Sequence, residues 1–232
     1  MNGYFIPYSV NTGEYNMEYD KYLLEHSIEN NIKKPIFRLY GWSPACVSLG
    51  RNQNDEHINK EFCIQNNIDI VRRLTGGRAL LHDNELTYSF VCPVEFLKNG
   101  ETVIQSYKEI SGALALGLNK LGLNAEFPVE KKAHTSFEYC MSLATGADLS
   151  IDNKKIIGSA QFRKQGYILQ HGSIMFDYDE QQLEKIFGEK PLTEKITTIN
   201  NINPNIKLEE LCLALKNGIE DFFELTFEKS II

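Results

Sequence analysis

The stretch 68–93, IDIVRRLTGGRALLHDNELTYSFVCP, constrains the fold of this chain more than any other part of the sequence. Apolar and polar residues alternate over 68–73 and again over 86–91, and a period of two residues predicts strands. Gly76 and Gly77 lie between these segments, and without a Cβ atom their backbone can adopt positive φ angles and approach a ligand closely. Two alternatives remain open: a Gly-Gly hairpin turn, or a turn whose N–H groups bind a ligand.

Three arginines surround this glycine pair. Arg72 and Arg73 precede it, and Arg78 follows it directly. Guanidinium groups donate hydrogen bonds to carboxylate and phosphate oxygens, so the segment suits a ligand that carries an acyl or phosphate group. The alternative is that the three side chains are solvated around a hairpin.

Several blocks of the sequence resemble one known family. The segment RRLTGGRALLHD at 72–83, followed by ELTYS at 85–89, resembles the signature of the lipoate-protein ligase and octanoyltransferase family. Further blocks match in the family's order: Asn16-Met17, FRLYGW at 37–42, SLGRNQ at 48–53, KIIGSAQ at 155–161 and QHGSI at 170–174. The resemblance covers most of the chain, and separate blocks in register are more specific than one Gly-rich turn.

The resemblance implies a substrate site and its residues. The substrate-binding residues would be Arg72, Arg73, Gly76, Gly77, Arg78, His82, Gly158 and Ser159. Lys155 matches the family's functional lysine, whose ammonium group would donate to a thioester carbonyl or a developing oxyanion. On the residues alone, Lys155 is better explained as an exposed turn lysine beside Lys154, and His82 and His171 as hydrogen-bonded structural groups. If a turn end projects its ammonium group toward the site, Lys155 would stabilise the transition state and contribute little to folding. Lys155→Ala would then slow acyl transfer and leave the melting temperature near wild type.

Cys140 is the candidate nucleophile. A thiolate attacks acyl thioesters, and the nearby Lys131, Lys132 and His134 would favour the ionised form of the thiol. On the residues alone, a free cysteine is more often a small buried hydrophobe. The remaining cysteines are expected to be structural: Cys46, Cys63, Cys92 and Cys212. The position of Cys140 resembles the nucleophile of the cysteine octanoyltransferases that load the glycine-cleavage H protein. Those relatives commonly continue with Phe and then Pro-Ser, whereas Met141 follows here, so the loop would differ in shape.

Two further features favour transfer of an activated acyl group over ATP-dependent activation of a free acid. The family's ligases more often carry Gly at the position of Arg78, whereas TGGRALLHD is similar to the octanoyltransferases. Ligases also commonly carry an accessory C-terminal domain, for which little sequence remains after Phe223. The second feature is the weaker one, because some ligases have this part as a separate protein.

Periodicity predicts a mixed β-sheet flanked by helices, an α+β fold in a single domain over 1–232. With 232 residues and 42% hydrophobic content, the chain can bury a full core. Helices are expected over 18–30, 102–121, 180–187 and 208–223, and strands over 36–40, 148–151, 155–160 and 167–174. Tyr22 and Phe222 are expected on buried helix faces. The fold matches that of the biotin/lipoate protein ligase-like catalytic domain, which the resemblance also implies.

Charge and composition limit the possible partners. A net charge of −7 argues against a general nucleic-acid binder. Basic pairs in the central part of the chain would suit an acidic carrier domain if they converge, and otherwise are solvated loop residues. No apolar run is long enough to span a membrane and the N-terminus lacks signal-peptide order, so a cytoplasmic protein without membrane contact is expected. The cysteine spacing predicts no structural metal.

These features together predict an acyltransferase. An octanoyl group on acyl carrier protein would pass through Cys140 to a lysine of a lipoyl domain, with the glycine-cleavage H protein as the expected acceptor and Lys155 stabilising charge. No cofactor is expected, and ATP and Mg²⁺ would be needed only by a ligase. The alternatives are an ATP-dependent lipoate-protein ligase, an amidotransferase between two lipoyl domains, and a non-enzymatic acyl- or carrier-binding protein.

Overall fold

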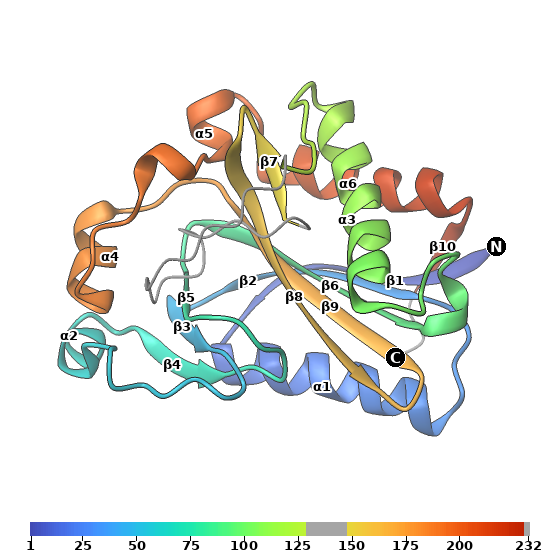
Figure 1. The fold of residues 1–232 in the computed structure, drawn as a ribbon, viewed down its shortest axis with the longest axis horizontal. Helices are drawn as coiled ribbons and strands as arrows, with labels where there is room; N and C mark the ends of the chain where they lie inside the picture. Colours follow the sequence, from blue (N-terminus) through green and yellow to red (C-terminus); the bar gives the residue numbers. More distant parts are fainter. Residues whose placement is uncertain (129–147, 230–232) are drawn as a thin grey trace.

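The computed structural model describes residues 1–128 and 148–229. Within them, a large sheet is formed by β1 (Asn2–Asn11), β2 (Ile36–Trp42), β6 (Glu85–Pro93), β7 (Leu149–Ile151), β8 (Lys154–Lys164), β9 (Tyr167–Met175) and β10 (Thr226–Lys229). The strand order is β10-β1-β2-β6-β9-β8-β7 (Figure 1). β1 runs parallel to both β10 and β2, and the remaining neighbours are antiparallel. The predicted mixed sheet is therefore confirmed.

A small sheet carries the segment that dominates the sequence analysis. It consists of β3 (Cys46–Leu49), β4 (Asp69–Arg72) and β5 (Leu80–His82), in the order β4-β3-β5. Because β3 separates β4 from β5, the strands on either side of Gly76 and Gly77 do not pair, and the Gly-Gly hairpin alternative is wrong. The turn instead crosses over β3. Gly77 has a φ of 92°, and its carbonyl oxygen lies so close to Gly50 that a side chain at Gly50 would overlap it.

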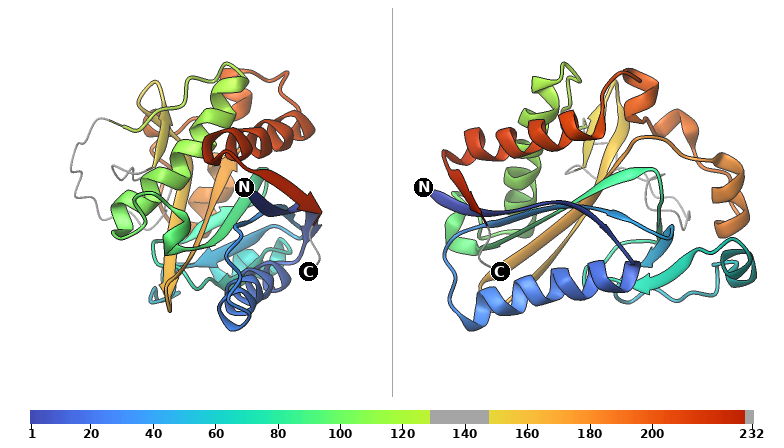
Figure 2. Two further views of the ribbon diagram at one scale, coloured as in Figure 1. Left: turned by 90° about the vertical axis from the view of Figure 1, so that its right-hand side faces the viewer. Right: turned by 180° about the vertical axis from the view of Figure 1, so that it is seen from behind.

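Helices cover both faces of the large sheet. The helices are α1 (Gly13–Glu29), α2 (Lys60–Gln65), α3 (Val103–Lys120), α4 (Glu180–Phe187), α5 (Ile199–Ile202) and α6 (Leu208–Phe223), with short 3-10 turns η1 (Val94–Phe96) and η3 (Thr193–Lys195). Figure 2 shows α1 on one side of the sheet and α6 on the other, and α3 packs beside α6. None of the helices in the described residues has the length and apolar character needed to cross a bilayer.

Strand alternation divides the core between the two faces. On β6, Leu86, Tyr88 and Phe90 belong to the apolar cluster shared with α3 and α6, whereas Val91 packs with the α1 cluster. A period of two in a strand places successive side chains on opposite faces, which produces this division. The face toward α1 also carries the polar residues of β6, and the pocket described below lies on this face.

The predicted helices are all present, with two corrections. The first begins at Gly13 instead of residue 18, because the Thr12 side chain caps it by accepting a hydrogen bond from the Tyr15 N–H at 3.3 Å. Tyr22 and Phe222, expected to be buried, are 45% and 40% exposed. Tyr22 lies on the side of α1 opposite its buried residues, whereas Phe222 lies on the buried face of α6 but in the last turn of the helix.

The crossing of α3 and α6 generates a stability prediction. A Cβ atom on Gly218 would lie 2.6 Å from the Cα atom of Gly117 and 2.7 Å from the Ala113 carbonyl oxygen. Gly218→Ala should therefore destabilise the protein by about 1–3 kcal/mol through overpacking, although alanine has the higher helix propensity. In thermal unfolding this should lower the melting temperature by about 2–4 °C per kcal/mol.

Gly112→Ala, in α3, is the matched control. Its new methyl group would contact only the ring of the partly exposed Phe222, at 3.2 Å, and that ring can move. The control should melt at or above the wild-type temperature. Equal destabilisation by both variants would contradict the proposed close packing of the two helices.

Candidate active site

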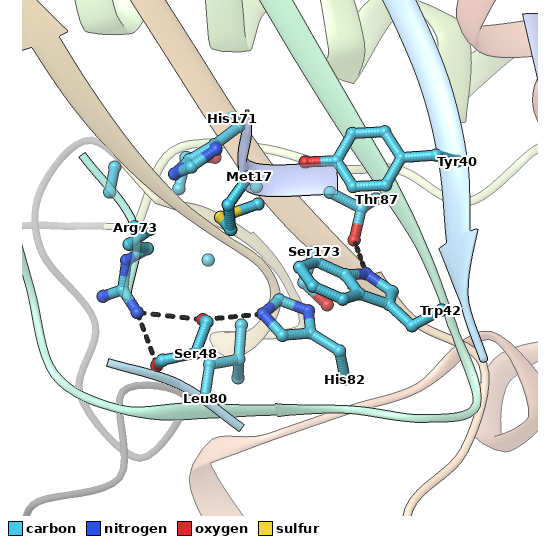
Figure 3. Close-up of a pocket in the computed structure, with 14 residues that line it drawn as sticks. Met17, Tyr40, Trp42, Ser48, Arg73, Leu80, His82, Thr87, His171 and Ser173 are labelled. Carbon is cyan, nitrogen blue, oxygen red and sulfur yellow. Dashed lines mark hydrogen bonds between the residues drawn. The ribbon is translucent and has the colours of Figure 1, made fainter. Parts of the chain in front are cut away.

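A pocket opens between the small sheet and the α1 face of the large sheet (Figure 3). It is lined by Met17, Tyr40, Trp42, Ser48, Arg73, Leu80, His82, Thr87, Gly158, Ser159, Ala160, His171, Gly172 and Ser173. Apolar surface comes from α1, β2 and β5, through Met17, Tyr40, Trp42 and Leu80. The polar groups come mainly from β3, β6 and β9 and from the segment after β4. The pocket thus joins apolar walls to a few convergent donors, which is typical of small-molecule sites.

Arg73 organises the turn that carries the two glycines. Its guanidinium is buried, and one nitrogen donates to the carbonyl and hydroxyl oxygens of Ser48, at 2.8 and 3.0 Å. The other nitrogen donates to the carbonyls of Gly76 and Arg78, at 2.9 and 2.7 Å. Arg73 therefore fixes the glycine turn against β3. Arg72, on the opposite face of β4, donates instead to backbone carbonyls of the 50–53 loop.

His82 stands at the centre of the pocket wall. Its Nε2 atom lies 2.8 Å from the Ser48 hydroxyl, and its Nδ1 atom lies 2.9 Å from the Glu85 carboxylate. The imidazole stacks on the Trp42 indole with ring centroids 4.0 Å apart (Figure 3). The Trp42 N–H donates to Thr87 at 2.8 Å, so the indole is itself held in place.

A second histidine, His171, lies on the opposite side of the pocket. Its Nε2 atom is 2.7 Å from the Thr75 hydroxyl and its Nδ1 atom is 3.1 Å from Asp20. Burial lowers the pKa of His171 below its usual 6.5, and the opposing effect of Asp20 does not overcome this. Burial tends to raise the pKa of Asp20, but the hydrogen bond from His171 and the charge of Arg38 outweigh it, so the net pKa is lowered.

Lys155 is placed differently from the sequence-based expectation. It is only 2% exposed, so it is not a turn-end lysine. Its ammonium group forms an ion pair with Asp148 at 3.0 Å. The Tyr107 hydroxyl lies 3.0 Å from Asp148 and 2.7 Å from the Ser159 carbonyl oxygen. Lys155 is therefore joined to the pocket wall through Asp148 and Tyr107, although it does not line the pocket in the described residues.

The structure brings together only part of the predicted site. Arg73, His82, Gly158 and Ser159 line the pocket; Arg72, Gly76, Gly77 and Arg78 lie in or beside the turn that Arg73 fixes. Cys140 lies outside the described residues, as do the basic residues expected near it. The binding and catalytic roles of all these residues stay predictions.

Sequence reasoning assigned no chemical role to several residues of the pocket and its supports. They are Asp20, Trp42, Ser48, Thr75, Glu85 and His171. Most occur in the blocks that carry the family resemblance, and this was the only available signal. The described residues contain no cluster of three or more His, Cys, Asp or Glu side chains placed to bind a metal ion.

Comparisons with known proteins give one consistent result. The family model for the lipoyl protein ligase A/B catalytic domain matches residues 12–220. The chain is 38% identical to octanoyltransferase LipM of Carboxydothermus hydrogenoformans, covering 97% of this chain and 88% of that protein. It is 39% identical to octanoyltransferase LipM of Clostridioides difficile, covering 93% of this chain and 84% of that protein.

Solved structures share the fold. A crystal structure of lipoate-protein ligase A bound with ATP has a TM-score of 0.83 at 22% identity, covering all of this chain and 90% of that one. A lipoate protein ligase from T. acidophilum, described as putative and holding lipoic acid, has a TM-score of 0.79 at 22% identity, with coverage of 100% and 90%. At this identity the likeness concerns the fold, and it confirms the α+β architecture.

The buried ion pair of Lys155 changes the stability expected of its variants. Lys155→Ala leaves the Asp148 carboxylate buried without this cation, which should cost about 3–5 kcal/mol of unfolding free energy. Lys154→Ala removes an exposed lysine and should stay within about 0.5 kcal/mol of wild type. Urea unfolding measures both. If the Lys155 variant unfolds at the same urea concentration as the Lys154 variant, the ion pair does not stabilise the fold.

His171 should also contribute to the pH dependence of stability. Its pKa is lower in the folded protein than the usual 6.5, so below that pH the unfolded chain binds a proton that folded His171 does not. Folding stability should thus be fully present above pH 6.5 and fall as the pH drops toward the folded pKa. Between about pH 7.5 and about pH 5.5, the wild-type melting temperature should fall more steeply than that of His171→Gln. The other histidines are common to both proteins, and parallel curves would exclude the effect.

Proposed function

Because the chain belongs to the lipoyl protein ligase A/B catalytic-domain family, we propose that it is an octanoyltransferase that takes its octanoyl group from an acyl carrier protein. The acceptor is a lysine of a lipoyl-domain protein, with the glycine-cleavage H protein as the expected one. Octanoyl transfer is supported by 38–39% identity to octanoyltransferases LipM over more than nine-tenths of this chain.

One observation on the pocket carries the geometric part of the proposal. Its walls include the apolar surfaces of Met17, Tyr40, Trp42 and Leu80, and a hydrogen-bonded row of Arg73, Ser48 and His82 forms one polar part of the lining. An uncharged aliphatic chain gains free energy by burial against the apolar walls. The acyl carbonyl, the one polar group of such a ligand, would lie toward this polar part of the lining. A saturated acyl group therefore fits the pocket better than a charged or polyhydroxylated ligand.

The reaction consists of two acyl transfers, first from the carrier's thiol to the Cys140 thiol and then from Cys140 to the acceptor amine. The Cys140 thiolate attacks the carbonyl of the donor thioester, forms a new C–S bond and releases the carrier's thiol. The acceptor amine then attacks this enzyme thioester, an amide forms, and the Cys140 thiol is regenerated. Each step begins with an activated thioester, so no nucleotide is consumed. In this scheme Lys155 stabilises negative charge that develops on the carbonyl oxygen.

The environments of the other cysteines support the choice of Cys140. Burial raises the pKa of the Cys46, Cys63 and Cys92 thiols, and it raises that of Cys212 to about 11. A thiol with a raised pKa holds little of the nucleophilic thiolate at neutral pH. The four cysteines in the described part of the chain are therefore poor nucleophiles.

This proposal predicts a covalent intermediate. Octanoyl carrier protein alone should add one octanoyl group to the enzyme, and hydroxylamine should remove it, because thioesters are labile to this reagent. Intact-mass spectrometry detects both changes. Cys140→Ala should form no adduct, whereas Cys212→Ala, the matched control, should form it at the wild-type rate.

ATP separates this function from its main alternative. Apo acceptor should become octanoylated by the enzyme and octanoyl carrier protein at the same rate with and without ATP and Mg²⁺. Efficient modification from free lipoate only when ATP is present would show a lipoate-protein ligase. Binding of octanoyl carrier protein without turnover would show a non-enzymatic carrier-binding protein, and transfer only from an octanoylated lipoyl domain would show an amidotransferase.

A further inference from the structure

The small sheet leaves the outer edge of β4 open. In the order β4-β3-β5, β4 pairs with β3 alone among the described strands. The N–H groups of Asp69 and Arg73 donate to carbonyls of the 45–49 segment, at 2.8 and 3.0 Å. Because the backbone groups of a strand point alternately to its two sides, the N–H and C=O groups of Ile70 and Arg72 face away from β3. None of the described residues forms a hydrogen bond with these backbone groups.

A groove with a volume of about 400 Å³ follows this open edge. It lies between β4 and the first turns of α1, which are neighbours in the fold (Figure 1). The groove is lined by Asp69, Ile70, Val71 and Arg72 of β4 and by Glu14, Met17 and Glu18 of α1. Successive side chains of a strand point to opposite faces. Four consecutive residues of β4 therefore line this groove through their backbone edge.

An open strand edge beside a helix suits an extended peptide, which can add to the sheet as a further strand. The peptide would pair with the open backbone groups of Ile70 and Arg72, and its side chains would point alternately toward α1 and away from it. Since β4 is four residues long, about four residues of the peptide would pair with it. A short edge strand with charged residues can also stay unpaired in solution, but here α1 gives the edge a second wall.

The α1 side of the groove is acidic. Glu14 and Glu18 belong to α1 itself. Asp69 shares this side, because it lies two residues from Val71, whose side chain packs in the cluster of Met17. Basic side chains on the peptide face that is directed to α1 would therefore meet three carboxylates.

The charges also exclude two other occupants. Glu18 is paired with Lys21 at 3.2 Å, whereas Glu14 and Asp69 form no ion pair with a described residue. Arg72 is the one basic residue among the described residues that line the groove, and its guanidinium donates to carbonyls of its own neighbouring loop. An acidic peptide, or the same edge of a second copy of this chain, would place carboxylates against carboxylates, which is destabilising.

We propose that the groove between β4 and α1 binds an extended, basic segment of a partner protein by strand addition. The segment pairs with the N–H and C=O groups of Ile70 and Arg72, and its lysine or arginine side chains, at alternate positions, face Glu14 and Asp69. Met17 lines both this groove and the active-site pocket, so the bound segment lies beside that pocket. Binding here requires neither acyl transfer nor an acyl group on the enzyme.

A model peptide tests the proposal on the full-length protein. The probe is a capped, fluorescein-labelled peptide of about seven residues in which lysine and valine alternate, so that all lysines share one face of the strand. Fluorescence anisotropy should show saturable binding that weakens as the salt concentration rises. The same peptide with glutamate in place of lysine should bind at least about tenfold more weakly. Equal binding of the two peptides would overturn the proposed basic occupant.

N-methylated peptides test strand addition on the wild-type protein. One version carries N-methyl groups on its valines and the other on its lysines, since only alternate N–H groups of an added strand face β4. One version should bind about tenfold or more weakly, and the other should bind like the unmodified peptide. Loss in the valine version would show an antiparallel strand, and loss in the lysine version a parallel one. Equal binding by both versions, or equal loss in both, would overturn strand addition.

Charge variants locate the binding site. Glu14→Gln and Asp69→Asn should each weaken binding of the lysine peptide by about twofold to fivefold. Glu29→Gln is the matched control, because it removes an exposed carboxylate at the other end of α1, outside the groove, and its Kd should equal that of wild type. An equal loss in the control would overturn the assignment to this groove, because net charge would then explain binding. Dimerisation of the wild-type protein that the peptide abolishes would assign the groove to a second copy and overturn the proposed occupant.

Discussion

A single buried carboxylate joins the helix and the strands that form the pocket. Asp20, on α1, accepts hydrogen bonds from β2 through Arg38 and Tyr40, from β6 through Ser89 and from β9 through His171. A buried charge of this kind is tolerated only when it is paired and fully hydrogen-bonded. The requirement fixes the position of α1 on the sheet, and with it the pocket wall at Met17 and His171.

The guanidinium of Arg73 has the corresponding role on the small sheet. It holds β3 and the glycine turn together through carbonyl groups of Ser48, Gly76 and Arg78. The two sheets then meet through histidine contacts, His82 of β5 with Glu85 of β6 and Thr75 of the glycine turn with His171 of β9. The donors of the pocket are therefore pre-organised by the same hydrogen bonds that join the sheets.

The sequence predicted the positions of helices and strands better than it predicted the burial and contacts of individual side chains. Strand period and turn residues located the β7–β8–β9 hairpins, and helical period located α3, α4 and α6 almost to the residue. The predicted exposure of Lys155 was wrong, because a lysine at the start of a strand, beside an exposed lysine, gives no sign in the sequence of a buried partner. That partner, Asp148, precedes β7, and the pairing of β7 with β8 brings the two together.

The amino-acid sequence by itself determined the family, many of the helices and strands, and the segments that surround the site, because periodicity, turn chemistry and blocks of matching residues are properties of neighbouring positions. Only the tertiary structure decided which side chains meet. Asp20 and His171 stand 151 residues apart, and Thr75 and His171 stand 96 apart. Their contacts depend on strand order and on the packing of α1, which no local pattern encodes.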